Sequence, residues 1–168
     1  MLKDRIRAIL ALGKVPSLLA LDVQKAFDNV SHRRLIHNLR KRKIPDRITG
    51  WVYSFLSDRF TSVRLQDFES SIEEVELGIP QGSPISPILY LFYNADLLEE
   101  SEDISISVTP TGFVDDISLL TYSKSTERNV RNLEKAYRKC LNWARTHGSR
   151  FNLEKSELIH FIGRKRKA

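Results

Sequence analysis

Two strongly apolar segments of this 168-residue chain are each interrupted by aspartate, and this pattern constrains the fold more than any other feature. Residues 18–21 run directly into Asp22, and the apolar stretch 113–120 contains Asp115 and Asp116. A carboxylate in a buried strand is costly unless it is compensated. We therefore expect two neighbouring strands whose carboxylates meet at one site, and a bound divalent cation is the best explanation for such a site.

Oxygen ligands alone favour Mg²⁺, which keeps several waters and binds phosphate oxygens of a substrate. Two such ions about 4 Å apart can activate an attacking hydroxyl and stabilise a leaving oxygen in phosphoryl transfer. The alternative is that Asp115 and Asp116 only form a turn, because aspartate is a common turn residue. An isolated Asp-Asp pair does not decide between these interpretations.

The apolar spacing predicts one α+β domain with a mostly antiparallel sheet that helices cover on one face. Helices are predicted from Leu2, from the N-cap Ser31, after Pro45, from Ile88, and around residues 130–144. The helix after Pro45 is expected to place Ile44, Ile48, Trp51, Val52 and Phe55 on one side. Strands are predicted at residues 18–21, 61–65, 72–77, 104–108, 113–120 and 158–162, with residues 61–65 and 72–77 half-buried. The strands at 104–108 and 113–120 are expected on either side of residues 110–112, with Asp115 and Asp116 at or near a tight turn. Residues 78–87 are expected to form a loop.

The net charge of +6 hides an uneven distribution along the chain. Residues 31–64 hold nine Lys and Arg against two acids, residues 67–103 hold ten acids and no Lys or Arg, and residues 124–168 hold thirteen bases against four acids. Two basic zones around an acidic one suit binding of a polyanion, although basic side chains also simply solvate helix faces. The candidate nucleic-acid-binding residues are Arg40, Lys41, Arg42 and Lys43, and residues 163–168 form a basic tail.

Other classes of protein are disfavoured by the same sequence. One cysteine, Cys140, excludes an intramolecular disulfide and a cysteine zinc cluster. The apolar stretches are far shorter than the roughly 20 residues of a membrane span, and the first residues lack the apolar core of a secretory signal. We therefore expect an intracellular protein without a membrane partner.

Three segments together resemble the ordered motifs of reverse transcriptases. Asp22 with residues 26–28 resembles motif A, residues 78–84 resemble motif B, and residues 113–116 resemble motif C. Gly148, Asn152 and Lys155 resemble the later motif D. The resemblance covers about residues 2–161 and is closest to the polymerases of non-LTR (LINE-like) retrotransposons, with a fungal element as one candidate source. It implies a polymerase palm.

Within the motifs, the resemblance implies a role for each acid. Asp22 and Asp115 match the two aspartates that bridge the metal ions, and the Val23 carbonyl matches an additional ligand. Asp116 matches the third, weaker acid. The implied cofactor is a pair of Mg²⁺ ions, for which Mn²⁺ can substitute.

The resemblance also implies nucleotide-binding residues. Phe27 matches a bulky residue beneath the sugar, where a ring clashes with a 2′-hydroxyl and so favours deoxynucleotides; the alternative is an ordinary core phenylalanine. Gln81 and Gly82 match the loop that touches the incoming nucleotide and the template. Lys155 matches a proton donor to pyrophosphate, and a surface lysine is its alternative.

Three functional hypotheses follow. The first is an RNA-directed DNA polymerase domain that uses an RNA template, a DNA primer and dNTPs. About twenty residues precede Asp22 and thirteen follow Lys155, so residues 1–168 are predicted to be a single palm fragment of a longer polyprotein, with fingers and thumb largely absent. The second is therefore a truncated or inactive retrotransposon remnant that folds and binds nucleic acid without polymerising. The third, an RNA-dependent RNA polymerase or a nucleotidyl cyclase, is disfavoured by Phe27 and by Gln81 with Gly82.

Overall fold

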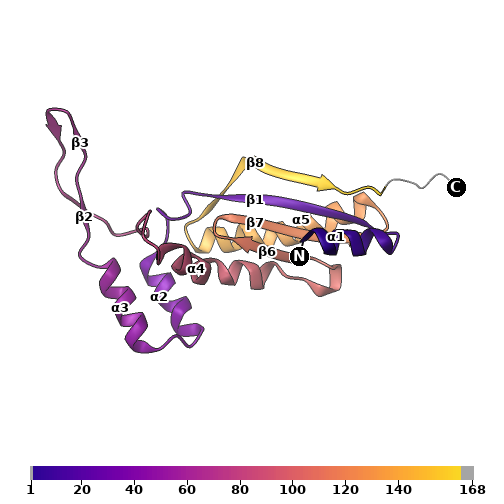
Figure 1. Cartoon of the computed structure of the whole chain (residues 1–168), viewed down its shortest axis with the longest axis horizontal. Helices are drawn as coiled ribbons and strands as arrows, with labels where there is room; N and C mark the ends of the chain where they lie inside the picture. Colours follow the sequence, from indigo (N-terminus) through magenta and orange to yellow (C-terminus); the bar gives the residue numbers. More distant parts are fainter. Residues whose placement is uncertain (1, 164–168) are drawn as a thin grey trace. The chain divides into compact units, whose positions relative to one another are not determined.

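A computed structural model describes residues 2–163 of the chain. They form two compact units (Figure 1). The first unit combines residues 2–24 with residues 95–163, and the second is Lys25–Asn94. Each unit is described by itself below.

The first unit is built on a four-stranded antiparallel sheet with the strand order β6-β7-β1-β8. The strands are β1 (Val15–Gln24), β6 (Thr109–Phe113), β7 (Asp116–Ser123) and β8 (Arg150–His160). The predicted α+β fold with an antiparallel sheet is confirmed. β8 is longer than predicted, since it begins at Arg150 rather than near residue 158.

Helices lie on both faces of this sheet. Ser17 is buried and accepts a hydrogen bond from the Asn129 side chain of α5 (Thr126–Thr146), so this side of β1 faces α5. The next residue, Leu18, clusters with Ile9 of α1 (Leu2–Ala11), because alternate residues of a strand point to opposite faces. α5 supplies the main cover that the sequence predicts, and α1 adds a cover on the other face.

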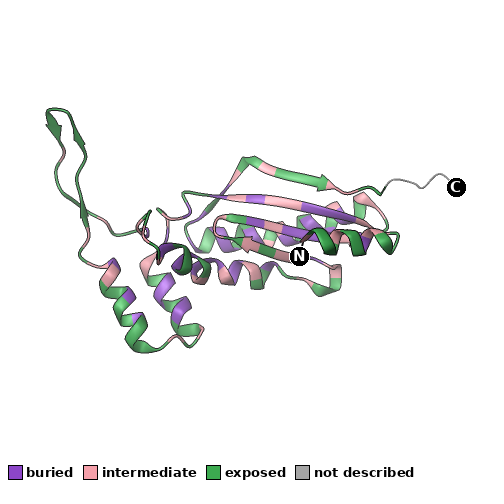
Figure 2. Ribbon diagram, viewed as in Figure 1, coloured by how far each residue is buried: buried purple, intermediate pink, exposed green. Residues whose placement is uncertain are grey.

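Both faces of β7 contribute to the core: residues 117, 119 and 121 are buried on one face, and Leu120 is buried on the other, where it clusters with Ile9 and Leu18 (Figure 2). The C-terminal half of α4 (Ser86–Ser101) belongs to the same unit. A Cβ added to Gly112 of β6 would lie 3.1 Å from a Leu98 methyl group of α4. β6 and this part of α4 are therefore closely packed.

The prediction of a strand at residues 104–108 is wrong. Residues Ile104–Ile106 form the 3₁₀ helix η1, which begins after Asp103. The Asp103 carboxylate accepts hydrogen bonds from the Ser105 N–H at 3.1 Å and from the Ser105 hydroxyl at 2.6 Å. These local hydrogen bonds replace the strand ladder that apolar alternation alone indicated.

The Asp-Asp pair lies at a tight turn, as predicted, but the expected break between strands at residues 110–112 is wrong. Pro110, Thr111 and Gly112 all lie within β6, which pairs with β7 out to Phe113 opposite Asp116. The turn instead consists of residues 114 and 115. The hairpin is therefore longer, and its turn contains the first aspartate of the Asp-Asp pair.

The second unit contains α2 (His32–Lys41), α3 (Asp46–Leu56) and the first part of α4. The predicted N-cap is confirmed, since the Ser31 hydroxyl accepts from the Arg34 N–H at 3.4 Å. Asn38 is fully buried in α2, and its amide donates to the Phe92 and Tyr93 carbonyls at 3.3 and 3.1 Å. These bonds fix α2 against α4 within the unit.

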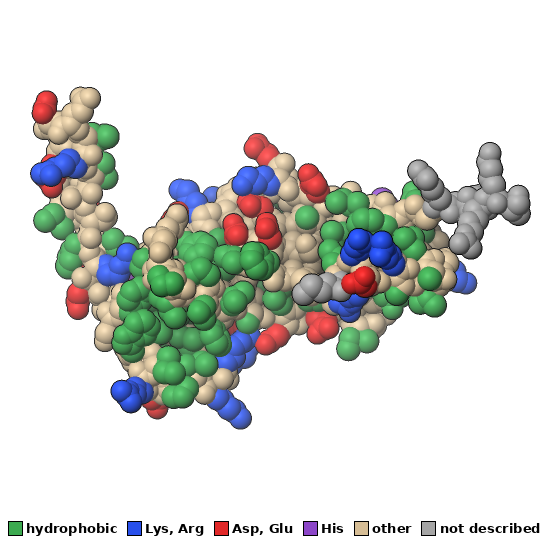
Figure 3. All heavy atoms as spheres, viewed as in Figure 1, with side chains coloured by type: hydrophobic (Ala, Val, Ile, Leu, Met, Phe, Trp, Pro, Cys, Tyr) green, Lys and Arg blue, Asp and Glu red, His purple; other side chains and the backbone are tan. Residues whose placement is uncertain are grey.

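The prediction of half-buried strands between residues 61 and 77 is wrong. Four two-residue strands form here: β2 (Phe60–Thr61), β3 (Arg64–Leu65), β4 (Phe68–Glu69) and β5 (Glu73–Glu74). They pair only with one another, β2 with β5 and β3 with β4, and every residue in them is exposed. Ile48 and Trp51 of α3 are about half exposed as well, at 50% and 53%. Figure 3 shows such hydrophobic side chains on the surface.

No helix among residues 2–163 is long and apolar enough to cross a membrane.

Candidate active site

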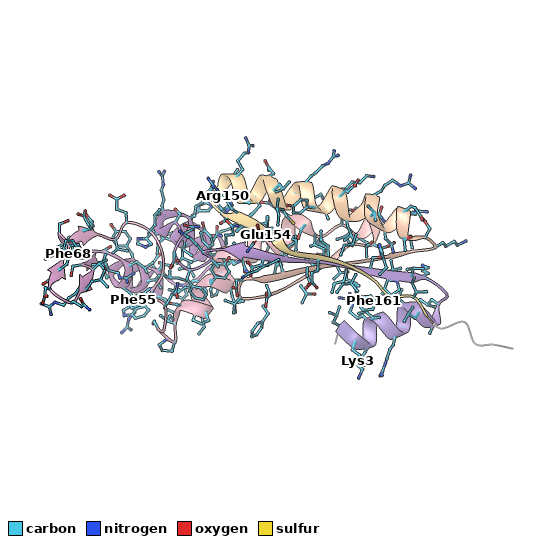
Figure 4. The ribbon with its side chains drawn as sticks, turned by 90° about the horizontal axis from the view of Figure 1, so that it is seen from above. Lys3, Phe55, Phe68, Arg150, Glu154 and Phe161 are labelled. Carbon is cyan, nitrogen blue, oxygen red and sulfur yellow. The ribbon has the colours of Figure 1, made fainter. Side chains whose placement is uncertain are left out.

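Asp22 and Asp116 are paired residues of neighbouring strands. In the register of β1 and β7, the Cα of Asp22 lies opposite that of Asp116. Asp22 is four residues from Leu18 and Asp116 is four from Leu120, so both carboxylates belong to the face that α1 covers farther along the strands. Figure 4 shows this face on the side of Lys3 and Phe161, with α5 on the opposite side of the sheet.

Asp115 lies beside this pair in the turn between β6 and β7. Its backbone carbonyl accepts a hydrogen bond from the Val23 N–H at 3.3 Å, which fixes the turn to β1 next to Asp22. The other turn residue, Val114, has a φ of +55°. A β-branched residue in this left-handed region is strained. The hairpin thus holds Asp115 in a tight and strained turn, directly before Asp116 at the start of β7.

Lys155 of β8 completes this group of charged side chains. Its Nζ lies 3.5 Å from Oδ1 of Asp22, and the two side chains are 65% and 21% exposed. Figure 3 shows acidic side chains gathered over the ends of β1 and β7 with basic ones beside them. A pocket of about 340 Å³ is lined by Ala20, Leu21, Asp22, Asp116, Ile117, Ser118 and Lys155.

The chemistry of this donor set fits Mg²⁺. Its carboxylates offer only oxygen ligands, and Mg²⁺ is commonly bound through one or two carboxylates while it retains waters. Among residues 2–163, no three His, Cys, Asp or Glu side chains converge in a metal-ligating arrangement. The paired Asp22 and Asp116 are therefore the part of the predicted ligand set that the fold brings together directly.

Phe27 and the residues of the motif B loop lie in the second unit. Phe27 stacks on the buried ring of Tyr90, with centroids 5.5 Å apart and an interplanar angle of 20°. The Gln81 side chain donates to Oδ1 of Asp28 at 2.8 Å. Gly82 is exposed and has a φ of +88°, a conformation that suits glycine.

Gly78 is required by the close approach of two backbone segments. A Cβ at this position would lie 2.8 Å from the Asp28 carbonyl oxygen, and its φ is +88°. The Gly78 N–H donates to Val30, and the Ile79 N–H donates to Phe27, both at 2.8 Å. The loop after residue 77 is thus held directly against residues 27–30.

Two residues that contact this loop, Asp28 and His32, were not predicted from the sequence to have a role. Asp28 accepts from Gln81, and His32 bonds the Gly78 carbonyl through Nε2 at 2.7 Å. Because a carbonyl only accepts, Nε2 of His32 must carry the proton. Asp28 stood within motif A and could have been singled out there, whereas the 46-residue separation of His32 from Gly78 leaves no local signal.

The four predicted nucleic-acid-binding residues lie together at the end of α2. Arg40 and Lys41 form its last turn, Arg42 is the C-cap, and Lys43 has a φ of +59°. Basic side chains at this position also interact favourably with the helix dipole. Within the predicted basic tail, residues 164–168 lie outside the described residues.

A family model described as "Reverse transcriptase (RNA-dependent DNA polymerase)" matches residues 2–167. The chain belongs to this family. The predicted likeness to non-LTR retrotransposon polymerases is confirmed by its relatives. The RNA-directed DNA polymerase from mobile element jockey of Drosophila melanogaster is 32% identical over 151 residues, 86% of this chain and 16% of that protein. The Pol polyprotein from the type-1 retrotransposable element R2 of Popillia japonica is 29% identical over 71% of this chain and 21% of that protein.

Solved structures show the same fold. Apo telomerase from Candida tropicalis, truncated from its C-terminal domain, superposes on 99% of this reverse transcriptase chain with a TM-score of 0.71 and 16% identity. The chain covers 36% of that structure. The chain thus spans well under half of these relatives. The relatives from retrotransposons are insect proteins, and the fungal source stays a prediction.

Proposed function

We propose that this reverse transcriptase chain contributes the palm of an RNA-directed DNA polymerase, which transfers dNTPs to the 3′ end of a primer. The observation that supports this most is the pairing of Asp22 with Asp116 on an accessible part of the sheet, with Asp115 in the adjoining turn. Carboxylates brought together in this way repel each other, which favours a cation between them. Residues 1–168 belong to one palm region in this proposal.

In the proposed site, Asp22, Asp115 and Asp116 hold two Mg²⁺ ions together with the Val23 carbonyl, and Mn²⁺ substitutes for them. When bound, the ions would supply charge stabilisation for the attacking and leaving oxygens of phosphoryl transfer. Lys155, whose Nζ lies 3.5 Å from Oδ1 of Asp22, is the proton donor to the pyrophosphate leaving group in this proposal. Asp22 and Asp115 would be the principal ligands of the ions, and Asp116 would be the weaker one.

The motif B loop and Phe27 bind the nucleotide in this proposal. Phe27 is held flat against Tyr90, so its ring cannot easily swing away from a 2′-hydroxyl. Gln81 and Gly82 contact the incoming dNTP and the template. The polyanionic partners are an RNA template and a DNA primer, with Arg40, Lys41, Arg42 and Lys43 contributing phosphate contacts.

The test replaces the matching segment of the jockey polymerase by this chain and measures primer extension on an RNA template with Mg²⁺ and dNTPs. Extension is expected, and Asp22→Asn should abolish it, while Asp67→Asn, an exposed acid between β3 and β4, should not. Phe27→Val should admit ribonucleotides without loss of deoxynucleotide incorporation. Extension that survives Asp22→Asn would refute the proposed site.

A second candidate function is favoured by the fraction of the relatives that this chain spans, 16% of the jockey polymerase. Positioning of reactants accounts for about 7–11 kcal/mol of a barrier, and the rest of the relatives' length is available to provide it. We propose that the isolated chain folds and binds nucleic acid in a salt-dependent manner without extending a primer. Binding to single-stranded RNA that does not weaken as salt rises would contradict this.

A further inference from the structure

Asp28 has no role in the function proposed above. It nevertheless forms a hydrogen bond with Gln81, one of the residues proposed to bind the nucleotide. Its side chain is exposed in the turn that follows β1, and its Oδ1 accepts a hydrogen bond of 2.8 Å from the Gln81 amide nitrogen. An ionised carboxylate only accepts hydrogen bonds, so the nitrogen of the Gln81 amide must face Asp28. The amide oxygen of Gln81 is then directed away from Asp28.

The backbone around this contact is fixed by independent bonds. The Gly78 N–H donates to the Val30 carbonyl and the Ile79 N–H to the Phe27 carbonyl, both at 2.8 Å. On the other side of the same peptide group, the His32 Nε2–H donates to the Gly78 carbonyl at 2.7 Å. Ile79 is only 3% exposed, so the start of the loop is anchored in the unit as well.

Beyond Ile79, the anchoring continues to the start of α4. The Ser86 hydroxyl, fully buried, donates to the Pro80 carbonyl at 2.6 Å. Gln81 therefore extends from a backbone that is held on both sides. With the backbone fixed, the Gln81 side chain can still rotate, and its hydrogen bond to Asp28 restricts this rotation.

We propose that Asp28 is a positioning residue for Gln81, which fixes the amide so that its oxygen is presented to a hydrogen-bond donor of the incoming dNTP. This inference rests on the proposed function of the Gln81 loop. Without Asp28, the amide samples rotamers in which its nitrogen replaces its oxygen. Part of the binding free energy is then spent on ordering this side chain.

The first experiment follows the Gln81 side-chain amide by NMR in the 168-residue chain, without nucleotide. Asp28→Ala should move the two Nε2–H resonances toward random-coil values and speed their exchange with water. Asp28→Asn should restore much of the wild-type signal, because its carbonyl oxygen can still accept. Asp67→Ala, which removes another exposed carboxylate of the unit, is the control and should leave the resonances in place.

The second experiment titrates dGTP with Mg²⁺ into wild type, Asp28→Ala, Gln81→Ala and the double variant. Loss of one hydrogen bond predicts roughly three- to tenfold weaker binding for each single variant. Since Asp28 acts through Gln81, the double variant should bind no more weakly than Gln81→Ala alone. Asp28→Asn should stay within about twofold of the wild type.

The outcomes separate the inference from the function on which it rests. Unchanged Gln81 resonances in Asp28→Ala would overturn the positioning contact, whatever the nucleotide does. Additive losses in the double variant would overturn the action of Asp28 through Gln81. A wild-type chain that shows the Asp28-dependent amide signal but no dGTP binding would overturn the nucleotide-binding role of the loop and leave the contact itself confirmed.

Discussion

Asp22 and Asp116 lie directly opposite each other across β1 and β7, and Asp115 occupies the turn that follows from this register. Like charges opposite each other in an antiparallel pair are destabilising. Without metal, Asp116→Asn should therefore leave the free energy of unfolding unchanged or raise it by about 0.2–1 kcal/mol. Urea unfolding measures this change, with Asp67→Asn as control.

Addition of Mg²⁺ should make the wild type more stable than Asp116→Asn. A ligand that binds only the folded state stabilises it by mass action, so Mg²⁺ should raise the Tm of wild type more than that of Asp116→Asn. A loss of more than about 1 kcal/mol in Asp116→Asn without metal would instead make Asp116 a structural residue.

Val114 is expected to be a strained position. Its φ of +55° is unfavourable for a β-branched residue, at a cost of about 1–3 kcal/mol, whereas glycine adopts it freely. Glycine loses more conformational entropy on folding than valine, which offsets part of the relieved strain. Val114→Gly should therefore raise the free energy of unfolding by about 1 kcal/mol. Val114→Ala keeps the positive φ and is the matched control. Destabilisation by the glycine would show that the Val114 side chain contributes more than its backbone costs.

Gly78→Ala should destabilise the second unit by about 2–4 kcal/mol. The added Cβ would lie 2.8 Å from the Asp28 carbonyl oxygen, and the atoms that it meets belong to the backbone, which cannot move aside cheaply. In the same variant, the backbone amides of residues 78 and 79 should exchange with solvent faster than in the wild type. Gly50→Ala in α3, where nothing lies within 4 Å of the new Cβ, is the control and should be neutral or stabilising. Equal stability of the two variants would refute the close approach.

Cys140 should be inert in the folded protein. Burial in α5 raises the pKa of its thiol to about 12, so the reactive thiolate is almost absent at neutral pH. A disulfide reagent should label it slowly in buffer and rapidly in concentrated urea. Because the folded state keeps a proton that the unfolded state releases, the contribution of Cys140 to stability should fall as the pH rises from about 9 toward 12. Fast labelling of the folded chain would contradict its burial.

Asp103 should make stability depend on acid pH. The Ser105 hydroxyl, and then Lys139 at 3.0 Å, lower the pKa of Asp103 from 3.8 to about 2. Its contribution is therefore fully present above 3.8 and is lost as the pH falls toward 2. The difference in Tm between wild type and Asp103→Asn should narrow across this window. A constant difference would show that the charge of Asp103 is not what stabilises η1.

The sequence by itself determined the local elements and the positions of the motifs. Ser31 caps α2 because its hydroxyl has a backbone N–H within reach three residues later, and the apolar spacing of residues 130–144 lies within α5. These features depend on neighbours a few positions away, which a linear pattern records. The sequence alone also identified the family, because the motifs are recognised by their residues and by their order along the chain.

Only the tertiary structure decided which groups meet. The register that places Asp116 rather than Asp115 opposite Asp22 depends on a two-residue turn, and a shift of one residue would reverse the faces of β7. The contact between Asp28 and Gln81 joins residues 53 apart. The sequence also did not predict that β2–β5 are exposed, because an alternating pattern indicates a strand but does not show which other segment covers it. Pairing and burial are properties of distant segments, and for that reason the local sequence did not determine them.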